Sequence, residues 1–327
     1  MIKIKVVALA GGVGGAKLVD GLSRILRSDY LTVIVNTGDD FDHLGLRICP
    51  DLDTVCYTLA GLANLTTGWG RKAETWNAMQ SLAELGGPIW FRLGDWDLGT
   101  HLERTRLLAE GSTLSEVTKK FCEIWGILPQ ILPMSDNLVP TIVRSDQGEL
   151  AFQDYFVKRN CQPRVTGFYF AGIESAKPSP GVQQALTEAE IVLICPSNPW
   201  VSIDPILAVP GIKEAILDDS VRKQVIAVSP IIAGEAVKGP AAKIYLEMGI
   251  RPSAASVAQH YGSREMGGFL DGYVFDHLDA DQDQEIIGLG LATLETNTLM
   301  RTIEDRMRLA EEVIDFSKQL INSNLIP

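Results

Sequence analysis

The segment at residues 6–22, VVALAGGVGGAKLVDGL, limits the possible folds more than any other part of the sequence. An apolar run at 4–10 meets a cluster of glycines, and the apolar residues that follow recur at helical spacing up to Leu26. A second apolar run follows at 31–36. A strand, a glycine loop, a helix and a strand within 36 residues predict a βαβ unit with a right-handed crossover.

Two later apolar runs, at 191–197 and 225–232, are typical of parallel strands that are buried on both faces. We therefore expect an α/β fold, Rossmann-like and doubly wound, with a mainly parallel sheet. With 327 residues and 46% hydrophobic content the chain can bury one large core, so we expect a single domain over 1–327. The pattern from about 54 to 170 is mainly helical and then weakly strand-like, which predicts an insertion that roofs the active site.

An amphipathic helix is expected at the carboxyl-terminal end, because Ile303, Met307, Ala310, Ile314 and Ile321 recur at helical spacing. Core packing explains this stripe better than a surface for a partner, although both interpretations stay open.

The charge and the rare residues exclude several kinds of protein. The net charge is −12, and no run of Lys or Arg is dense enough to follow a nucleic acid or an anionic membrane. No apolar stretch approaches the roughly 20 residues that span a bilayer. The five cysteines form no C-x-x-C pair, and the four histidines show no zinc spacing. We expect a cytoplasmic protein without nucleic-acid or membrane partners.

The glycine loop matches neither common phosphate-binding motif. A P-loop requires Gly-Lys-Ser/Thr, whereas Lys17 follows Ala16 and precedes Leu18, and a Rossmann fingerprint fails in both possible registers. Glycines between a buried strand and a helix nevertheless let amides converge at a helix N-terminus, where negative charge is favoured. We expect an anion there, and a tight turn without a ligand is the alternative.

Acidic residues gather just beyond the second strand and before the next helix. Asp39, Asp40 and Asp42 lie in NTGDDFDHLG, and Asp51 and Asp53 lie in CPDLDTVCYTL. One of the latter two could cap the helix, but a cap explains only one aspartate. Because Mg²⁺ binds one or two carboxylates together with substrate phosphates, these loops favour metal-assisted phosphoryl chemistry.

Three further segments carry polar groups that suit a ligand site. FRLGDWDLGTHLERT at 91–105 is charged, and surface salt bridges are the alternative there. CPSNPWVSIDPIL at 195–207 leaves a buried strand, where loops tend to bind ligands. The segment at 228–243 likewise runs from a strand through a loop of small residues to a helix, and Ser229, Lys238 and Lys243 could contact a phosphate or a base. A plain connection without a ligand is the alternative there.

Ten segments, in their order along the chain, resemble the 2-phospho-L-lactate transferase family of coenzyme F-420 biosynthesis. They are GGVGGAK, VNTGDD, CPDLDT, GWGRKAETW, RLGDWDLGTH, ILPMSD, FQDYF, PSNPWVSI, ILAVPGI and VSPIIAGEAVKGPAAK. The resemblance runs over nearly the whole chain. The forms GGVGGAK, GWG with ETW, and HYG look closer to the bacterial branch, whose members are phosphoenolpyruvate transferases.

The resemblance implies a Mg²⁺-dependent transferase that forms homodimers and acts on small molecules. It would move a phospho-carboxylic acid, phosphoenolpyruvate or 2-phospho-L-lactate, from its guanosine diphosphate adduct to the terminal ribityl hydroxyl of the deazaflavin Fo. GMP would leave, and the product would be coenzyme F-420-0 or its dehydro form. The enolpyruvyl donor is favoured, and a 3-phosphoglycerate donor also exists in the family.

The resemblance also implies roles for individual residues. Asp53 and Arg92 match positions at which the family contacts Fo. The hypothesised metal ligands are Asp40 and Asp51, and with Asp53 these form the predicted catalytic set. The diphosphate is expected on the glycine loop, at Gly12, Gly14, Gly15 and Lys17. The guanosine is expected at the loop after residue 195, on Ser197 and Asn198.

Two other functions compete with a transferase. A non-catalytic regulator that binds a nucleotide or nucleotide-sugar would share the glycine loop and the VNT strand with a related family of gluconeogenesis factors. It would have no reason to keep DLDT, GWG with ETW, and RLGDWD. A nicotinamide-dependent dehydrogenase is disfavoured because the second strand ends at Asn36, where that class has an acidic residue.

Overall fold

A seven-stranded sheet, parallel throughout, forms the centre of the protein. The computed structural model describes residues 2–236 and 240–323. The sheet has the order β14 (Ala292–Thr296), β13 (Gly272–Asp276), β10 (Gln224–Val228), β9 (Ile191–Ile194), β1 (Val6–Ala10), β2 (Leu31–Val35) and β5 (Gln130–Pro133). The predicted doubly wound α/β fold is confirmed.

The strand sequences explain why the sheet is covered on both faces. Val6, Ala8 and Ala10 of β1 belong to one apolar cluster, whereas Val7 and Leu9 belong to the other. All five are buried. A strand that is apolar at every position has no face for water, so helices must pack on both sides.

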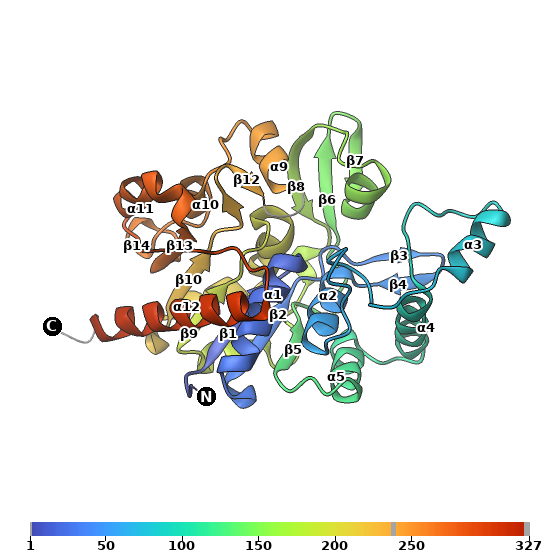
Figure 1. Cartoon of the computed structure of the whole chain (residues 1–327), viewed down its shortest axis with the longest axis horizontal. Coiled ribbons are helices and arrows are strands. Elements are labelled where there is room, and N and C mark those ends of the chain that lie inside the picture. Colours follow the sequence, from blue (N-terminus) through green and yellow to red (C-terminus); the bar gives the residue numbers. More distant parts are fainter. Residues whose placement is uncertain (1, 237–239, 324–327) are drawn as a thin grey trace.

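Helices of the first face come from the two ends of the chain. α1 (Gly12–Ile25) packs against α2 (Pro50–Leu59) and against α12 (Ile303–Ser323). Figure 1 shows α12 lying across the sheet beside α1. Ala310 and Ile314 of α12 are completely buried, so the apolar stripe that the sequence predicted packs in the core.

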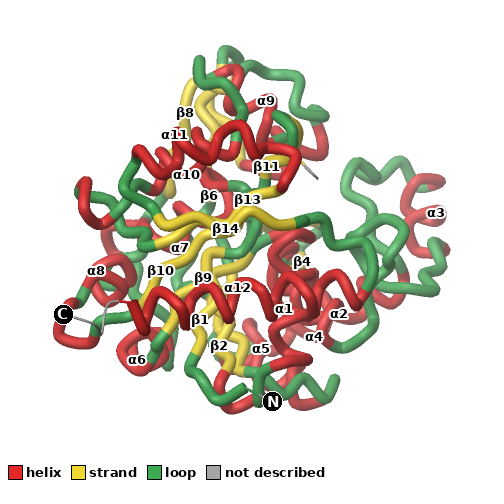
Figure 2. Tube along the Cα trace, turned by 60° about the vertical axis from the view of Figure 1, so that its left-hand side comes forward, coloured by secondary structure: helices red, strands yellow, loops and turns green. Residues whose placement is uncertain are grey.

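The opposite face is covered by the later helices, which surround the strands in Figure 2. They are α6 (Val182–Glu188), a π-helical turn at Pro199–Ile203, α7 (Asp204–Ala208), α8 (Ile212–Leu217), α9 (Ala241–Glu247), α10 (Ala254–Tyr261) and α11 (Asp283–Gly288). A small hairpin of β11 (Ile231–Ile232) and β12 (Glu235–Ala236) precedes α9.

The segment from 54 to 170 contains more than an insertion, because β5 lies within it and joins the central sheet beside β2. Around β5 lie α3 (Asn77–Glu84), α4 (Asp95–Ala109), α5 (Leu114–Ile124) and a separate antiparallel sheet of β6 (Thr141–Ser145), β7 (Gly148–Ala151) and β8 (Val165–Phe170). A hairpin of β3 (Phe41–His43) and β4 (Leu46–Ile48) comes before α2. In Figure 1, α3 stands far out from the central sheet.

The chain direction across the sheet reverses between β1 and β9. From β1 the chain proceeds to β2 and β5 on one side and then returns to β9 on the other. At such a switch point the loops after the two strands diverge to opposite faces, which leaves a crevice for ligands at the carboxyl ends of the strands.

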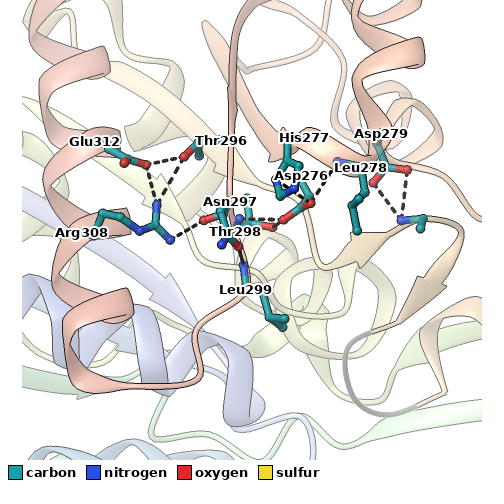
Figure 3. A network of polar contacts seen from close by, with 11 residues as sticks. Asp276, His277, Leu278, Asp279, Thr296, Asn297, Thr298, Leu299, Arg308 and Glu312 are labelled. Atoms are coloured by element: carbon teal, nitrogen blue, oxygen red, sulfur yellow. Dashed lines mark hydrogen bonds and ion pairs between the residues drawn. The ribbon is translucent and has the colours of Figure 1, made fainter.

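At the far end of this sheet edge, polar side chains at the end of β13 and in and after β14 form hydrogen bonds with one another and with α12. Asp276 accepts from the amide and the hydroxyl of Thr298, at 2.8 and 3.1 Å. Arg308 and Glu312 of α12 meet at the hydroxyl of Thr296 (Figure 3). Among the described residues, no helix is both long and apolar enough to cross a membrane.

Candidate active site

The glycine loop connects β1 to α1 at the switch point and packs tightly against the loop after β9. A Cβ on Gly14 would overlap the carbonyl oxygen of Pro196, and one on Gly15 would lie 2.7 Å from the Ser197 hydroxyl. Gly12 has a φ of +62°, a conformation that side chains disfavour. Each of these three positions therefore needs glycine for a definite steric reason.

Two of the amides at the start of α1 are already bonded. The Gly11 amide donates to the Ser197 hydroxyl at 3.2 Å, and that hydroxyl donates to the Gly11 carbonyl at 2.7 Å. The Gly12 amide donates to Asp51 Oδ1 at 2.7 Å. The first-turn amides of a helix have no partner one turn back, so those of Val13 and Gly14 are the candidate anion donors at the positive end of α1.

Asn36, directly after β2, joins two buried carboxylates. Its Nδ2 donates to Asp51 Oδ2 at 2.9 Å, to Asp39 Oδ1 at 3.2 Å and to the Val201 carbonyl at 3.0 Å. Its Oδ1 accepts from the Gly38 amide at 2.8 Å. The side chain of Asn36 is fully buried, so this amide sets the positions of both acids.

Both carboxyl groups are harder to ionise than usual. Burial raises the pKa of Asp51 to about 6, against the opposing hydrogen bonds from Asn36 and Gly12. Burial, and then the charge of Asp51, raise the pKa of Asp39 well above its ordinary value. Two buried acids that share one amide beside a helix N-terminus form a donor set suited to a divalent cation.

Asp40 makes different contacts from its neighbour Asp39. Burial raises its pKa to about 8, and the thiol of Cys49 and the guanidinium groups of Arg104 and Arg47 partly oppose this increase. Its interactions are therefore with α2 and α4 rather than with Asp51. Of the two adjacent aspartates, the structure brings Asp39 to Asp51, whereas the predicted ligand was Asp40.

Asp53 and Asp51 lie in the first turn of α2, but the capping position is Cys49, so neither aspartate is the N-cap that the alternative suggested. Asp53 forms a buried bidentate ion pair with Arg104 of α4. The Arg104 guanidinium also lies 3.1 Å from His101 Nδ1. The charged segment at 91–105 thus includes a buried ion pair as well as surface ones.

Asp53, Asp97 and His101 present potential metal-ligand atoms that lie within 4.8 Å of one another. The hydroxyl of Tyr57 donates to Asp97 at 2.7 Å. Arg104 already brings a positive charge to both oxygens of Asp53, and a second cation there would be repelled. Asp39 and Asp51 therefore fit a metal ion better than this cluster does.

The other predicted contacts lie in varied surroundings. Lys17 donates from Nζ to the Met300 carbonyl at 2.7 Å, ahead of α12. Arg92 is exposed, with its guanidinium 4.3 Å from the centre of the Trp76 ring. Asn198 accepts from the Trp200 amide at 3.1 Å, and its buried Nδ2 has no partner in the described part of the chain.

The segment at 228–243 is used for internal contacts where it is described. The hydroxyl of Ser229 donates to the Ile231 carbonyl at 2.8 Å. Lys243 lies 2.5 Å from Glu247, one turn further along α9. Lys238 lies outside the described residues.

The fold and this site define a class of α/β protein in which a glycine loop, a helix N-terminus and paired carboxylates meet at a topological switch point. The sequence model of the family described as "2-phospho-L-lactate transferase CofD" matches residues 6–287. The chain belongs to this family and is a transferase enzyme, as its motifs predicted.

Relatives with established names agree with the family. A phosphoenolpyruvate transferase of Streptomyces coelicolor is 41% identical over 322 residues, which cover 97% of this chain and 99% of the relative. One from Thermobifida fusca is 43% identical over 291 residues, covering 85% and 88%. A crystal structure of a UPF0052 protein from Bacillus halodurans superposes with a TM-score of 0.63 over 96% of this chain and 99% of that one. At 16% identity, this last likeness concerns the fold alone.

Proposed function

We propose that this transferase moves a phospho-carboxylic acid from its guanosine diphosphate adduct to the terminal ribityl hydroxyl of the deazaflavin Fo, in coenzyme F-420 biosynthesis. The hydroxyl oxygen attacks the phosphorus nearer the carboxylic acid. The bond from that phosphorus to the bridging oxygen breaks, the hydroxyl proton is released, and GMP leaves. The donor is proposed to be the enolpyruvyl adduct, because the relatives described above are named phosphoenolpyruvate transferases.

One observation carries this proposal: the carboxylate pair of Asp39 and Asp51 lies directly beside the amides of the glycine loop. A diphosphate needs both positive dipoles and a cation, and these are the two kinds of group that this arrangement offers. Transfer of a phosphoryl-type group depends mainly on positioning and charge neutralisation, so no strong nucleophile is required of the protein.

The residues of the site have distinct tasks in this reaction. A Mg²⁺ ion held by Asp39 and Asp51 would neutralise charge on the diphosphate. The amides of Val13 and Gly14 orient the donor, and Gly12, Gly14 and Gly15 belong to the backbone that faces its diphosphate. The missing side chains of Gly14 and Gly15 let the loop after β9 pack against this backbone. Asn36 keeps the two carboxylates apart and correctly directed.

The remaining roles extend from the family resemblance. Ser197 and Asn198 are proposed to meet the guanosine end, since both lie in the loop after β9 across the crevice. Asp53 and Arg92 are proposed as contacts for Fo, and Asp40 as a third acidic group near the acceptor. Homodimer formation and a cytoplasmic location belong to the same proposal.

Release of GMP provides the test, with a matched pair of variants. We expect Asp51→Asn to reduce Mg²⁺-dependent GMP release by more than a hundredfold and to raise the Mg²⁺ concentration needed for half of the remaining rate. Asp29→Asn makes the same chemical change at an exposed ion pair with Arg27, which contributes little to stability. The proposal fails if both variants release GMP at the rate of the unmodified protein when Mg²⁺ is limiting.

A further inference from the structure

Ser202 is the only residue with a hydroxyl group in the π-helical turn Pro199–Ile203, and the proposed function gives it no role. Trp200, Val201 and Ile203 of this turn pack into the apolar cluster under the later helices. Ser202 does not belong to that cluster and lies against Gly11 of the glycine loop. Turns of this kind are rare and are frequently found at functional sites. This one brings a hydroxyl group to the start of α1.

Gly11 needs to be glycine for a reason of space, not of backbone conformation. Its φ of −153° and ψ of 157° are extended values that any residue adopts. A Cβ on Gly11 would lie 2.5 Å from Asp51 Oδ2 and 3.0 Å from Ser202 Oγ. Because both oxygens lie near the same point, they are close to each other. The missing side chain of Gly11 therefore lets a carboxylate oxygen and a hydroxyl oxygen face one shared space.

The Ser202 hydroxyl is buried without a partner among the described residues. Ser202 is 6% exposed, and its amide donates to the Asn198 carbonyl at 3.0 Å, but its hydroxyl forms no hydrogen bond to Asp51 or to another group in that part of the chain. Thr298, which is 5% exposed, shows the usual arrangement, because its hydroxyl donates to Asp276 (Figure 3). Buried hydroxyls nearly always have a partner, so this one points to a ligand beside Asp51.

The charge around Ser202 favours a cation as that ligand. Asp39 Oδ1, Asp51 Oδ2 and the Val201 carbonyl oxygen all accept from Nδ2 of Asn36. Each carboxylate has more lone pairs than its hydrogen bonds occupy. A phosphate oxygen next to two buried carboxylates would be repelled, whereas a divalent cation would be attracted. Mg²⁺ takes oxygen ligands, and a serine or threonine hydroxyl is one of them in other phosphate-binding loops.

We propose that the Ser202 hydroxyl is a third protein ligand of the divalent cation held by Asp39 and Asp51. This inference rests on the proposed function, because it completes the metal site of that reaction. The three ligands would come from the turn after β2, the start of α2 and the turn after β9. The cation would then tie together the two loops that diverge at the switch point of the sheet.

Binding of Mn²⁺ alone tests this assignment without any reaction. The electron paramagnetic resonance signal of free Mn²⁺ gives the Kd at pH 8 in the absence of substrates. Ser202→Ala should weaken this Kd by about five- to tenfold, since one of three protein ligands is lost. The control is Ser175→Ala, because Ser175 is exposed and its hydroxyl donates to the Gly172 carbonyl at 3.1 Å. This control should keep the Kd of the unmodified protein.

Cysteine at the same position distinguishes a metal ligand from a hydroxyl that only supports the structure. A thiolate binds Zn²⁺ well, whereas Mg²⁺ prefers oxygen. Ser202→Cys should therefore need at least about tenfold less Zn²⁺ than the unmodified protein to displace bound Mn²⁺. Ser175→Cys should need as much Zn²⁺ as the unmodified protein. Equal Zn²⁺ requirements for the two cysteine variants would contradict the proposal.

Parallel assays of GMP release separate a failure of this inference from a failure of the proposed function. If the unmodified protein releases GMP while Ser202→Ala binds Mn²⁺ normally, Ser202 is not a metal ligand and the reaction stands. If Ser202→Ala loses affinity for Mn²⁺ but the unmodified protein releases no GMP, the ligand stands and the proposed function is wrong. If the unmodified protein neither binds Mn²⁺ nor releases GMP, both ideas are wrong. Circular dichroism of each variant ensures that a weaker Kd is not the result of unfolding.

Discussion

Replacing Asn36 by alanine should destabilise the protein far more than an ordinary loss of an amide. Asn36 donates to two buried carboxylates and accepts from the Gly38 amide. A hydrogen bond to a charged group contributes about 1.5–3 kcal/mol, and a buried group left without its partner adds a desolvation cost. Protonation of Asp39 or Asp51 limits the loss, so we expect the free energy of unfolding to fall by about 3–5 kcal/mol at pH 8 without Mg²⁺.

Thermal unfolding followed by circular dichroism measures this change, and Asn64→Ala is its matched control. Asn64 accepts from two amides in an exposed turn, so its replacement should cost less than about 1 kcal/mol. For a chain of this size, Asn36→Ala should lower Tm by about 4–7 °C. A decrease no larger than that of Asn64→Ala would refute the idea that one amide holds the carboxylate pair.

Three further predictions concern the loop, the pH dependence and the metal. Gly14→Ala forces a Cβ against the Pro196 carbonyl, so it should lower the free energy of unfolding by about 1–3 kcal/mol and slow GMP release at least tenfold. The control is Gly99→Ala, which has open space on α4 and should raise the free energy of unfolding in urea by about 0.5–1 kcal/mol. Burial raises the pKa of Asp39 and Asp51, so the folded metal-free protein holds protons that the unfolded chain has lost. The contribution of these groups to stability should therefore decrease as pH rises from about 4 through about 6. The Tm of Asp39→Asn should rise over this range relative to that of the unmodified protein, and no difference between the two would contradict the prediction. Mg²⁺ should raise Tm more at pH 8 than at pH 5, since only ionised carboxylates bind it, and an equal effect at both values would place the metal elsewhere.

Four of the seven strands, β1, β2, β9 and β10, could be predicted because they are apolar at nearly every position. β13 and β14 were not predicted, and β14 reads ATLET, with polar residues at three of its five positions. The runs at 4–10, 31–36, 191–197 and 225–232 all contain strands of the sheet. β5 was missed because it has only four residues and ends at Pro133, which makes it too short to distinguish from a loop.

The sequence indicated the loops that form the candidate site, but it did not indicate that Asp39 and Asp51 lie together. Asp39 and Asp40 are neighbours in the sequence, and a turn in which the Asp40 amide donates to the Thr37 carbonyl at 3.2 Å directs the two side chains to different partners. Nothing in the spacing of two adjacent aspartates indicates which of them faces Asp51. Asn36 was noted only for lacking a negative charge, although its position at the end of a buried strand was a signal for a role in the site.

Arg104 illustrates a second limit of sequence reasoning. It lies 51 residues from Asp53, and a charged helix usually has its charges on the surface. Only the packing of α4 against β4, together with the contacts of Arg104 to Asp53 and to the Arg47 carbonyl, buries this guanidinium to 3% exposure. The sequence therefore indicated the residue types of the site, and the tertiary fold determined which of them form pairs.

The most direct test of the central claim is the identity of the product. Purified protein is incubated with Fo, Mg²⁺ and, in separate reactions, the enolpyruvyl, lactyl and 3-phosphoglyceryl adducts of guanosine diphosphate, and the products are identified by mass spectrometry. The proposed function predicts a phosphodiester of Fo together with an equal amount of GMP, most rapidly from the enolpyruvyl donor. Failure of all three donors to modify Fo, with the protein folded and Mg²⁺ present, would contradict it.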